Sequence, residues 1–165
     1  AAGELDAITI NFPTPQPKAK YAKKRLVHVD HLMLYRPLFA AGATVTLRTD
    51  SKPLRDYALG QFAAAGYDTL WVSDDVRRDH PEHPETEYEC RTREMGAVVY
   101  GICATPGEKP TEEQLATGRA QEQSLACYLP DDLDELTYVP LGMEEAVENF
   151  KNRARKGKKR LPQES

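Results

Sequence analysis

The sequence predicts an α/β fold with a mostly parallel sheet over residues 1–104, because strand-like and helix-like segments alternate along this part of the chain. Runs rich in β-branched residues are separated by segments whose apolar residues recur every three to four positions. Proline or glycine stands at most of the junctions between them. Such alternation is typical of strand–helix–strand units that place their strands side by side in one sheet.

The chain opens with a predicted strand over residues 5–12, in which apolar and polar residues alternate. The strand ends at Pro13-Thr14-Pro15-Gln16-Pro17, where three prolines favour an extended, semi-rigid loop. A basic strip over residues 18–25 follows directly.

A helix is expected from about Asp30 to Phe39, because the apolar residues there have helical spacing and Asp30 is a possible N-cap. Pro37 would kink or end this helix. We expect Ala41-Gly42-Ala43 to close it and residues 44–50 to form the second strand.

A second helix is expected over residues 51–65, with Gly66 ending it. Its expected buried face consists of Leu54, Tyr57, Ala58, Gln61 and Phe62. Residues 69–72 predict a short third strand and residues 73–85 a polar loop. The continuous apolar run at 96–104 predicts a last strand that is covered on both faces.

Residues 105–165 lack this alternation, and we interpret them as a second unit, a helical or irregular extension of the body at 1–104. One helix is expected over 111–125, where Thr111 and Gln114 form a weak capping box. The remaining features of the extension are an acidic segment at 131–135, a helix at 143–154 and a basic tail at 151–160.

Composition excludes several classes of protein. The chain has 165 residues, a mean hydropathy of -0.63 and no run of the ~18–20 apolar residues that a membrane span needs. Its first residues have neither the basic start nor the apolar stretch of a signal peptide. Three cysteines without a close pair favour reduced thiols over a disulfide or zinc framework. We therefore expect a cytoplasmic protein.

Basic residues gather in two strips, although the net charge is -4. The windows 18–25 and 151–160 together hold 12 basic residues and no acidic one. Strips of this kind can bind a polyanion locally, and they are also common as ordinary solvated surface. The charge alone leaves both interpretations open.

Candidate site residues lie where ligands of open α/β sheets gather, at the carboxyl ends of strands. Asp50 either caps the helix after it or accepts hydrogen bonds from the amide or amine edge of a base. The hydroxyl, ring and carboxylate of Thr86-Glu87-Tyr88-Glu89 could hold a purine or could serve as a helix cap or turn. The spacing fits both interpretations.

Two pairs of histidines, His28 with His31 and His80 with His83, are each three residues apart, a spacing that can bind metal. No cysteine or other third ligand is obvious, and prolines break any helix at the second pair. No metal site is predicted.

Three segments stand in order over about residues 5–104: residues 12–26, Thr49-Asp50 and residues 86–89. Together they resemble the carboxy-terminal half of the tRNA (guanine-N7-)-methyltransferase family. That family has the pattern F-P-D-P-W-x-K-x-x-H-x-x-R-R, then T-D, then T-x-[FY]-E before the final strand. Three motifs in register are far more specific than any one of them.

The resemblance implies a Rossmann-like fold with an antiparallel last strand, and transfer of a methyl group from S-adenosylmethionine to N7 of guanine in tRNA. By position, Lys18 and Asp50 match substrate-contacting residues, and Thr86, Glu87, Tyr88 and Glu89 match a substrate-binding segment. The residues implied to contact tRNA are Lys20, Tyr21, Lys23, Lys24 and Arg25.

The sequence departs from the family pattern at its Asp, Trp and His positions. Thr14 stands where the family has its catalytic Asp, Gln16 replaces the Trp and Tyr21 the His. A threonine cannot act as a base at neutral pH, but guanine N7 is itself nucleophilic, so transfer can rest on orientation. No glycine-rich cofactor turn occurs, and we expect the S-adenosylmethionine-binding half to be absent from this chain.

We therefore expect a fragment that supplies the tRNA and guanine side of a methyltransferase site. One alternative, favoured by Thr14, is a non-catalytic RNA-binding relative that has lost methyl transfer. Another is a protein-interaction domain with an unrelated basic tail. The strand around Ile8 would leave an open sheet edge, which predicts a homodimer.

Overall fold

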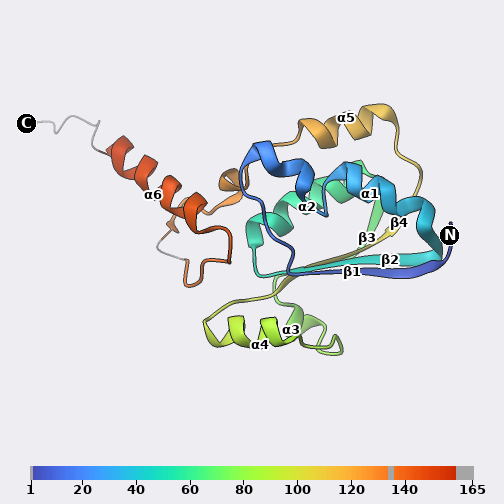
Figure 1. Cartoon of the computed structure of the whole chain (residues 1–165), viewed down its shortest axis with the longest axis horizontal. Coiled ribbons are helices and arrows are strands. Elements are labelled where there is room, and N and C mark those ends of the chain that lie inside the picture. The colour runs from blue at the N-terminus through green and yellow to red at the C-terminus, as the bar shows by residue number, and fades with distance from the viewer. Residues whose placement is uncertain (1, 134–135, 159–165) are drawn as a thin grey trace, which may run out of the picture.

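A computed structural model describes residues 2–133 and 136–158 and shows a four-stranded sheet with helices on both sides (Figure 1). The strands are β1 (Leu5–Asn11), β2 (Phe39–Thr49), β3 (Tyr67–Ser73) and β4 (Tyr100–Pro106). Their order in the sheet is β1-β2-β4-β3. β1 and β2 are parallel, and β4 is antiparallel to both of its neighbours. The expected α/β sheet with an antiparallel last strand is thus confirmed.

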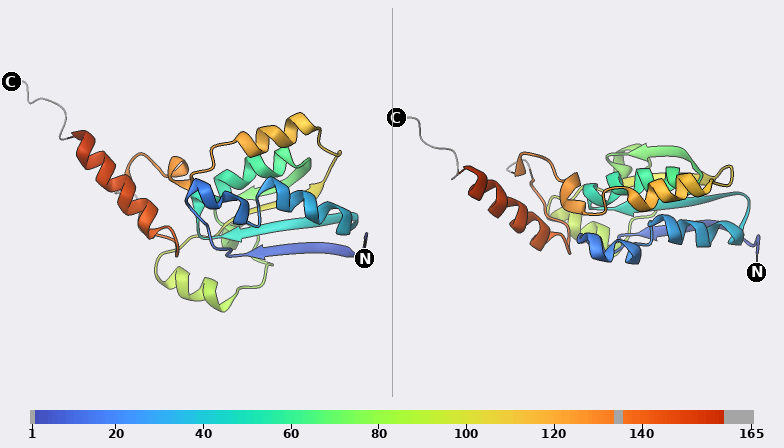
Figure 2. Two further views of the ribbon diagram at one scale, coloured as in Figure 1. Left: turned by 45° about the horizontal axis from the view of Figure 1, so that its top comes forward. Right: turned by 90° about the horizontal axis from the view of Figure 1, so that it is seen from above.

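The helices divide between the two sides of the sheet. On one side lie α1 (Val29–Tyr35), α2 (Lys52–Ala64) and α5 (Glu112–Ala120), and on the other lie α3 (Val76–Asp79) and α4 (Glu87–Glu94) (Figure 1). The helix α6 (Glu144–Lys158) extends away from the sheet (Figure 2). No helix in the described part of the chain is long and apolar enough to cross a membrane.

The main core lies between the sheet and α2. Val45 and Leu47 of β2, Ile102 of β4 and Leu54 and Phe62 of α2 share one buried cluster. All five residues of the expected apolar face of α2 are buried. Ser51 caps the helix by accepting a hydrogen bond from the Leu54 N–H, and Gly66 follows the helix at φ +71°. The boundaries of this helix could therefore be predicted from its capping serine and the glycine that follows it.

The region before β2 differs from the prediction. His28, not Asp30, is the N-cap of α1, because its Nδ1 accepts the Asp30 N–H at 3.2 Å. The α-helix ends at Tyr35, just before Pro37, as the proline rule predicts. β2 then starts at Phe39 rather than at residue 44, because parallel pairing with β1 extends the strand back through the Ala-Gly-Ala segment.

Three other predicted boundaries also shift. The predicted loop at 73–85 contains the short helix α3, which Asp75 caps. The last strand starts at Tyr100 rather than at residue 96. The predicted helix at 111–125 is α5, which ends at Ala120 and is followed by a 3-10 turn at Leu125–Tyr128. The capping box of Thr111 and Gln114 is confirmed.

The segment after residue 104 contributes to the core. Leu115, Leu125 and Met143 are buried within the main cluster, so these three residues belong to the same hydrophobic core as the sheet and α2. Part of the acidic segment (134–135) and the end of the basic tail (159–165) lie outside the described residues. The division into a body and an extension stays a prediction.

Candidate functional site

A small cavity lies where β1 and β2 end. Phe12 and Gln16, in the proline-rich loop after β1, have φ angles of 47° and 52°, a region that non-glycine residues rarely adopt. Strained backbone of this kind gathers at functional sites. The cavity has a volume of about 150 Å³ and is lined by Phe12, Pro13, Thr14, Pro15, Asp50, Tyr88, Leu141 and Gly142.

Asp50 is the charged group of this cavity. Its side chain does not cap α2, since Ser51 does so. Instead its Oδ2 accepts hydrogen bonds from the hydroxyls of Tyr88, at 3.0 Å, and Tyr138, at 2.8 Å. Burial, with the adjacent Asp50 carboxylate, raises the pKa of both phenols. Both tyrosines therefore remain donors at neutral pH and hold a carboxylate that is only 8% exposed.

The predicted segment 86–89 divides between two roles. Thr86 caps α4 through a hydrogen bond from the Glu89 N–H, and Glu87 is exposed on that helix. Only Tyr88 of the four reaches the cavity, where its ring packs on Phe12 with centroids 5.0 Å apart.

Glu89 is fully buried and lies away from the cavity lining. Its carboxylate pairs with Arg48 of β2 and with Arg77 of α3, the latter at 2.6 Å. Arg48 also donates to the carbonyl of Pro84 at 2.9 Å. This ion cluster joins the sheet to α3 and α4, and in this conformation Glu89 positions α4 rather than facing the cavity. Sequence reasoning missed Arg48, which stands in an otherwise ordinary strand pattern.

Most of the predicted basic strip forms one surface. Lys20, Lys23 and Lys24 are exposed on the 3-10 helix Ala19–Lys24. The ammonium groups of Lys20 and Lys24 lie 4.9 and 4.8 Å from the centroid of the Tyr21 ring. Cations stacked on an aromatic ring are a surface suited to phosphates and bases.

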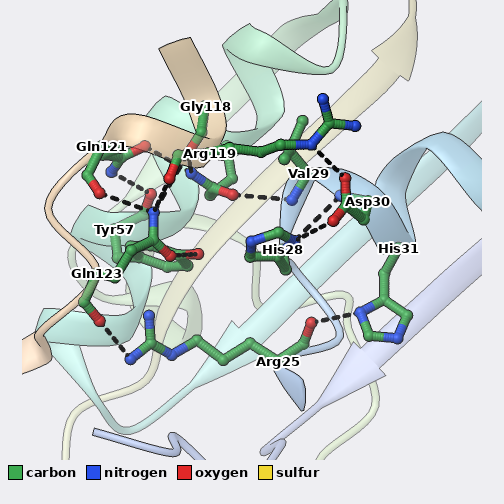
Figure 3. A network of polar contacts seen from close by, with 11 residues as sticks. Arg25, His28, Val29, Asp30, His31, Tyr57, Gly118, Arg119, Gln121 and Gln123 are labelled. Atoms are coloured by element: carbon green, nitrogen blue, oxygen red, sulfur yellow. Dashed lines mark hydrogen bonds and ion pairs between the residues drawn. The ribbon is translucent and has the colours of Figure 1, made fainter. Parts of the chain in front are cut away.

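Arg25 does not belong to that surface, and its predicted contact with tRNA phosphate needs correction. It is 1% exposed, and its guanidinium donates to the carbonyls of Pro15, Gln16 and Gln123. Figure 3 shows it reaching from the basic strip to Gln123, beneath Tyr57. Its carbon Cζ lies 4.4 Å from the centroid of the Tyr57 ring. Arg25 therefore fixes the proline-rich loop from inside.

Lys18 does not line the cavity and pairs with Glu145 of α6 at 2.8 Å. This contact raises the pKa of Lys18 and lowers that of Glu145. The later part of the chain thus reaches both predicted substrate-contacting residues, Asp50 through Tyr138 and Lys18 through Glu145. Neither partner was singled out from the sequence, because nothing local marks a residue that is 88 or more positions from its contact.

The two histidine pairs differ. His28 is buried as a helix cap, and His31 bonds to the Arg25 carbonyl at 2.8 Å (Figure 3). His80 and His83 lie together with Glu82, so that one ligand atom of each is within 4.8 Å of the others. Glu82 is the third residue with a metal-ligating side chain, and it was not obvious from the sequence.

Comparisons with known proteins agree on the first two thirds of the chain. A family model described as "Putative methyltransferase" matches residues 1–102. The tRNA (guanine-N(7)-)-methyltransferase of Streptococcus equi subsp. zooepidemicus (strain MGCS10565) is 33% identical over 105 residues, which are 63% of this chain and 50% of that protein. The protein of the same name from Alkaliphilus oremlandii is 34% identical over 103 residues, 62% of this chain and 49% of that protein.

The chain spans about half the length of the curated relatives it matches. The matched residues 1–102 include the basic strip and the cavity residues that follow β1 and β2. Tyr138 and Glu145 lie outside the match.

Proposed function

The chain belongs to the methyltransferase family whose model spans its residues 1–102, and from this premise we propose that it is the guanine-binding and tRNA-binding side of an S-adenosylmethionine-dependent tRNA (guanine-N7-)-methyltransferase. The observation that carries the proposal is Asp50, a shielded carboxylate at the end of β2, beside a strained loop and an aromatic wall.

Asp50 has the chemistry to orient a guanine. The N1–H and the N2 amino group of guanine are donors on one edge of the base, and a carboxylate accepts two such bonds side by side. Both phenolic donors bind the same oxygen, Oδ2, so we propose that the base approaches Oδ1 and displaces at least one phenol. Tyr88 and Phe12 supply the ring surface against which the base would stack.

Thr14 is exposed at the cavity and takes the catalytic position in the proposal. Guanine N7 carries a lone pair and no proton, so its attack needs no general base. The contribution of this chain is then orientation, in which Asp50 and Tyr88 hold the base and the uncharged Thr14 lies close to it.

The cavity beside Asp50 does not by itself fit S-adenosylmethionine. The cavity of about 150 Å³ is smaller than the several hundred Å³ typical of pockets for ligands of that size. The turn after β1 is built of prolines rather than glycines, so no row of backbone N–H groups faces a ligand. In our proposal the cofactor is held by the other half of the enzyme.

The basic strip supplies the affinity for tRNA. Lys18, Lys20, Lys23 and Lys24 are exposed along one segment, and Tyr21 offers a ring between two of them. Phosphate contacts of this kind provide most of the binding energy for nucleic acids and make it salt-dependent. We also propose a cytoplasmic location.

The edge strand β1 supports a homodimer of this chain. Among the described residues, β1 pairs only with β2, and most of the residues of β1 are exposed. An open edge offers unpaired N–H and C=O groups to a second copy. Analytical ultracentrifugation should show a dimer at micromolar concentration, and a monomer there would reject this part of the proposal.

A non-catalytic RNA-binding relative is the second candidate, and the uncharged Thr14 favours it. Transfer of labelled methyl to unmodified tRNA separates the two when the full-length gene product is compared with this 165-residue chain. Label at guanine N7 that disappears in Asp50→Asn, with tRNA still bound, supports the enzyme. Bound tRNA without label supports the binding-only relative, and loss of neither label nor binding in Asp50→Asn rejects the site.

A further inference from the structure

The loop between α3 and α4 brings two imidazoles and a carboxylate to one point, away from the cavity described above. His80 Nδ1 lies 3.3 Å and His83 Nε2 4.0 Å from the same oxygen of Glu82, Oε1. One ligand atom of each residue lies within 4.8 Å of the other two. No other group of three or more such residues meets this condition in the described parts of the chain.

We propose that His80, Glu82 and His83 form a binding site for a divalent transition metal, with zinc as the fitting ion. Tetrahedral zinc with bonds of about 2.0–2.1 Å places its ligand atoms about 3.4 Å apart. His80 Nδ1 and His83 Nε2 lie 3.3 and 4.0 Å from Glu82 Oε1, so small side-chain rotations bring the three atoms onto one ion. The fourth position would be filled by water, since all three side chains retain exposure to solvent.

The loop is held in a shape that favours binding. Proline at positions 81 and 84 restricts the backbone on both sides of Glu82. The His83 N–H donates to the His80 carbonyl at 3.2 Å, which closes a turn. The indole of Trp71 on β3 stacks on the His80 ring with centroids 4.0 Å apart and lies 5.8 Å from the His83 ring. Two ligands are thus positioned before a metal arrives.

Charge at the site also favours a cation. The Glu82 carboxylate lies beside both imidazoles and supplies a negatively charged ligand. Imidazole with a single carboxylate suits zinc, nickel, cobalt or copper, whereas magnesium and calcium prefer oxygen ligands.

The metal would fasten a loop that leads to the predicted substrate-binding segment. Pro84 accepts a hydrogen bond from Arg48, and two residues later Thr86 starts α4. The site is independent of the methyltransferase proposal, since it uses none of the residues that contact the cavity.

Trp71 is the sole tryptophan of the chain and lies against the site, so its fluorescence reports occupancy directly. We expect Ni²⁺, titrated into the metal-free 165-residue chain without an affinity tag, to quench Trp71 saturably with one equivalent. Zn²⁺ should displace Ni²⁺ and restore the emission. His80→Gln and His83→Gln should each weaken Ni²⁺ binding about tenfold or more, and Glu82→Gln should weaken it less.

His31→Gln is the matched control, because His31 bonds the Arg25 carbonyl outside the cluster and should bind Ni²⁺ like the parent chain. Far-ultraviolet circular dichroism of each variant confirms folding. Since His80→Gln also alters the stack on Trp71, His83→Gln is the decisive variant. Quenching that does not saturate, that survives His83→Gln, or that falls equally in His31→Gln would overturn the proposal.

Discussion

Removing one hydroxyl tests the contact between the late part of the chain and the cavity. In Tyr138→Phe, Asp50 loses the donor at 2.8 Å and keeps Tyr88 at 3.0 Å. A hydrogen bond to a charged group contributes about 1.5–3 kcal/mol. Because the second phenol remains, we expect the free energy of unfolding to fall by about 1.5 kcal/mol, the low end of that range. For a domain of this size that lowers the Tm by about 3–6 °C.

The double variant Tyr88→Phe/Tyr138→Phe sharpens the prediction. It leaves the Asp50 carboxylate buried without either donor, so its cost should exceed the sum of the two single changes by about 0.5–3 kcal/mol. Tyr35→Phe is the matched control, since the Tyr35 hydroxyl donates to the neutral carbonyl of Leu26 at an exposed site. That variant should lose about 0.5 kcal/mol, the low end for a neutral bond.

Urea denaturation followed by circular dichroism measures the parent chain and the four variants. If Tyr138→Phe is as stable as the parent chain while Tyr88→Phe is weakened, residues near 138 do not contact Asp50 in solution. Strict additivity of the two changes would show instead that the phenols do not share one carboxylate. Either result would refute the reasoning.

Three other variants test residues whose roles the structure assigns. Glu89→Gln removes the carboxylate that the buried Arg48 and the partly buried Arg77 share, and it should lower the free energy of unfolding by about 3–5 kcal/mol in urea denaturation. The exposed Glu87→Gln should stay within about 0.5 kcal/mol, and equal effects would contradict the buried ion cluster. Arg25→Ala should lower the free energy of unfolding by about 3 kcal/mol, because three hydrogen bonds to backbone carbonyls are lost. Lys24→Ala should leave stability unchanged and reduce the salt slope of tRNA binding, measured by fluorescence anisotropy, by about 1. An Arg25→Ala chain as stable as the parent would refute the buried structural role of Arg25. Burial lowers the pKa of His28 from its ordinary 6.5, so the unfolded chain binds the proton more readily than the folded chain. The stability that neutral His28 contributes is therefore fully present above pH 6.5 and is lost as the pH falls through the folded pKa. His28→Gln should flatten that dependence, and an unchanged profile would show that another group causes it.

Local sequence predicted the elements whose boundaries are set by their own residues. Ser51 and Gly66 delimit α2, and the Thr111 capping box starts α5, because caps and turns act within a few residues. The start of β2 was wrong by five residues, because pairing with β1 rather than local propensity extends that strand. His28 was missed as a cap because the histidine side chain is an uncommon N-cap.

The candidate site shows the same division. Asp50 was identified from its place after a strand, while its actual partners Tyr88 and Tyr138 are 38 and 88 residues away. The charge of Arg25 placed it on the basic surface, yet the fold uses it to hold three buried carbonyls. The charge of a side chain determines which groups it can bind, but burial determines whether it contacts solvent or the backbone.

Local sequence patterns were enough to identify the α/β class and the family, because both depend on short periodicities and on motifs in register. They also predicted the residues that we propose bind a base or a phosphate. Only the tertiary structure decided which of those residues face one another. It placed Glu89 in an ion cluster, joined Tyr138 to Asp50, and gathered His80, Glu82 and His83 beside Trp71. The physical reason is that these contacts arise when distant segments pack, and the free energy of burial that drives packing is a property of the whole fold.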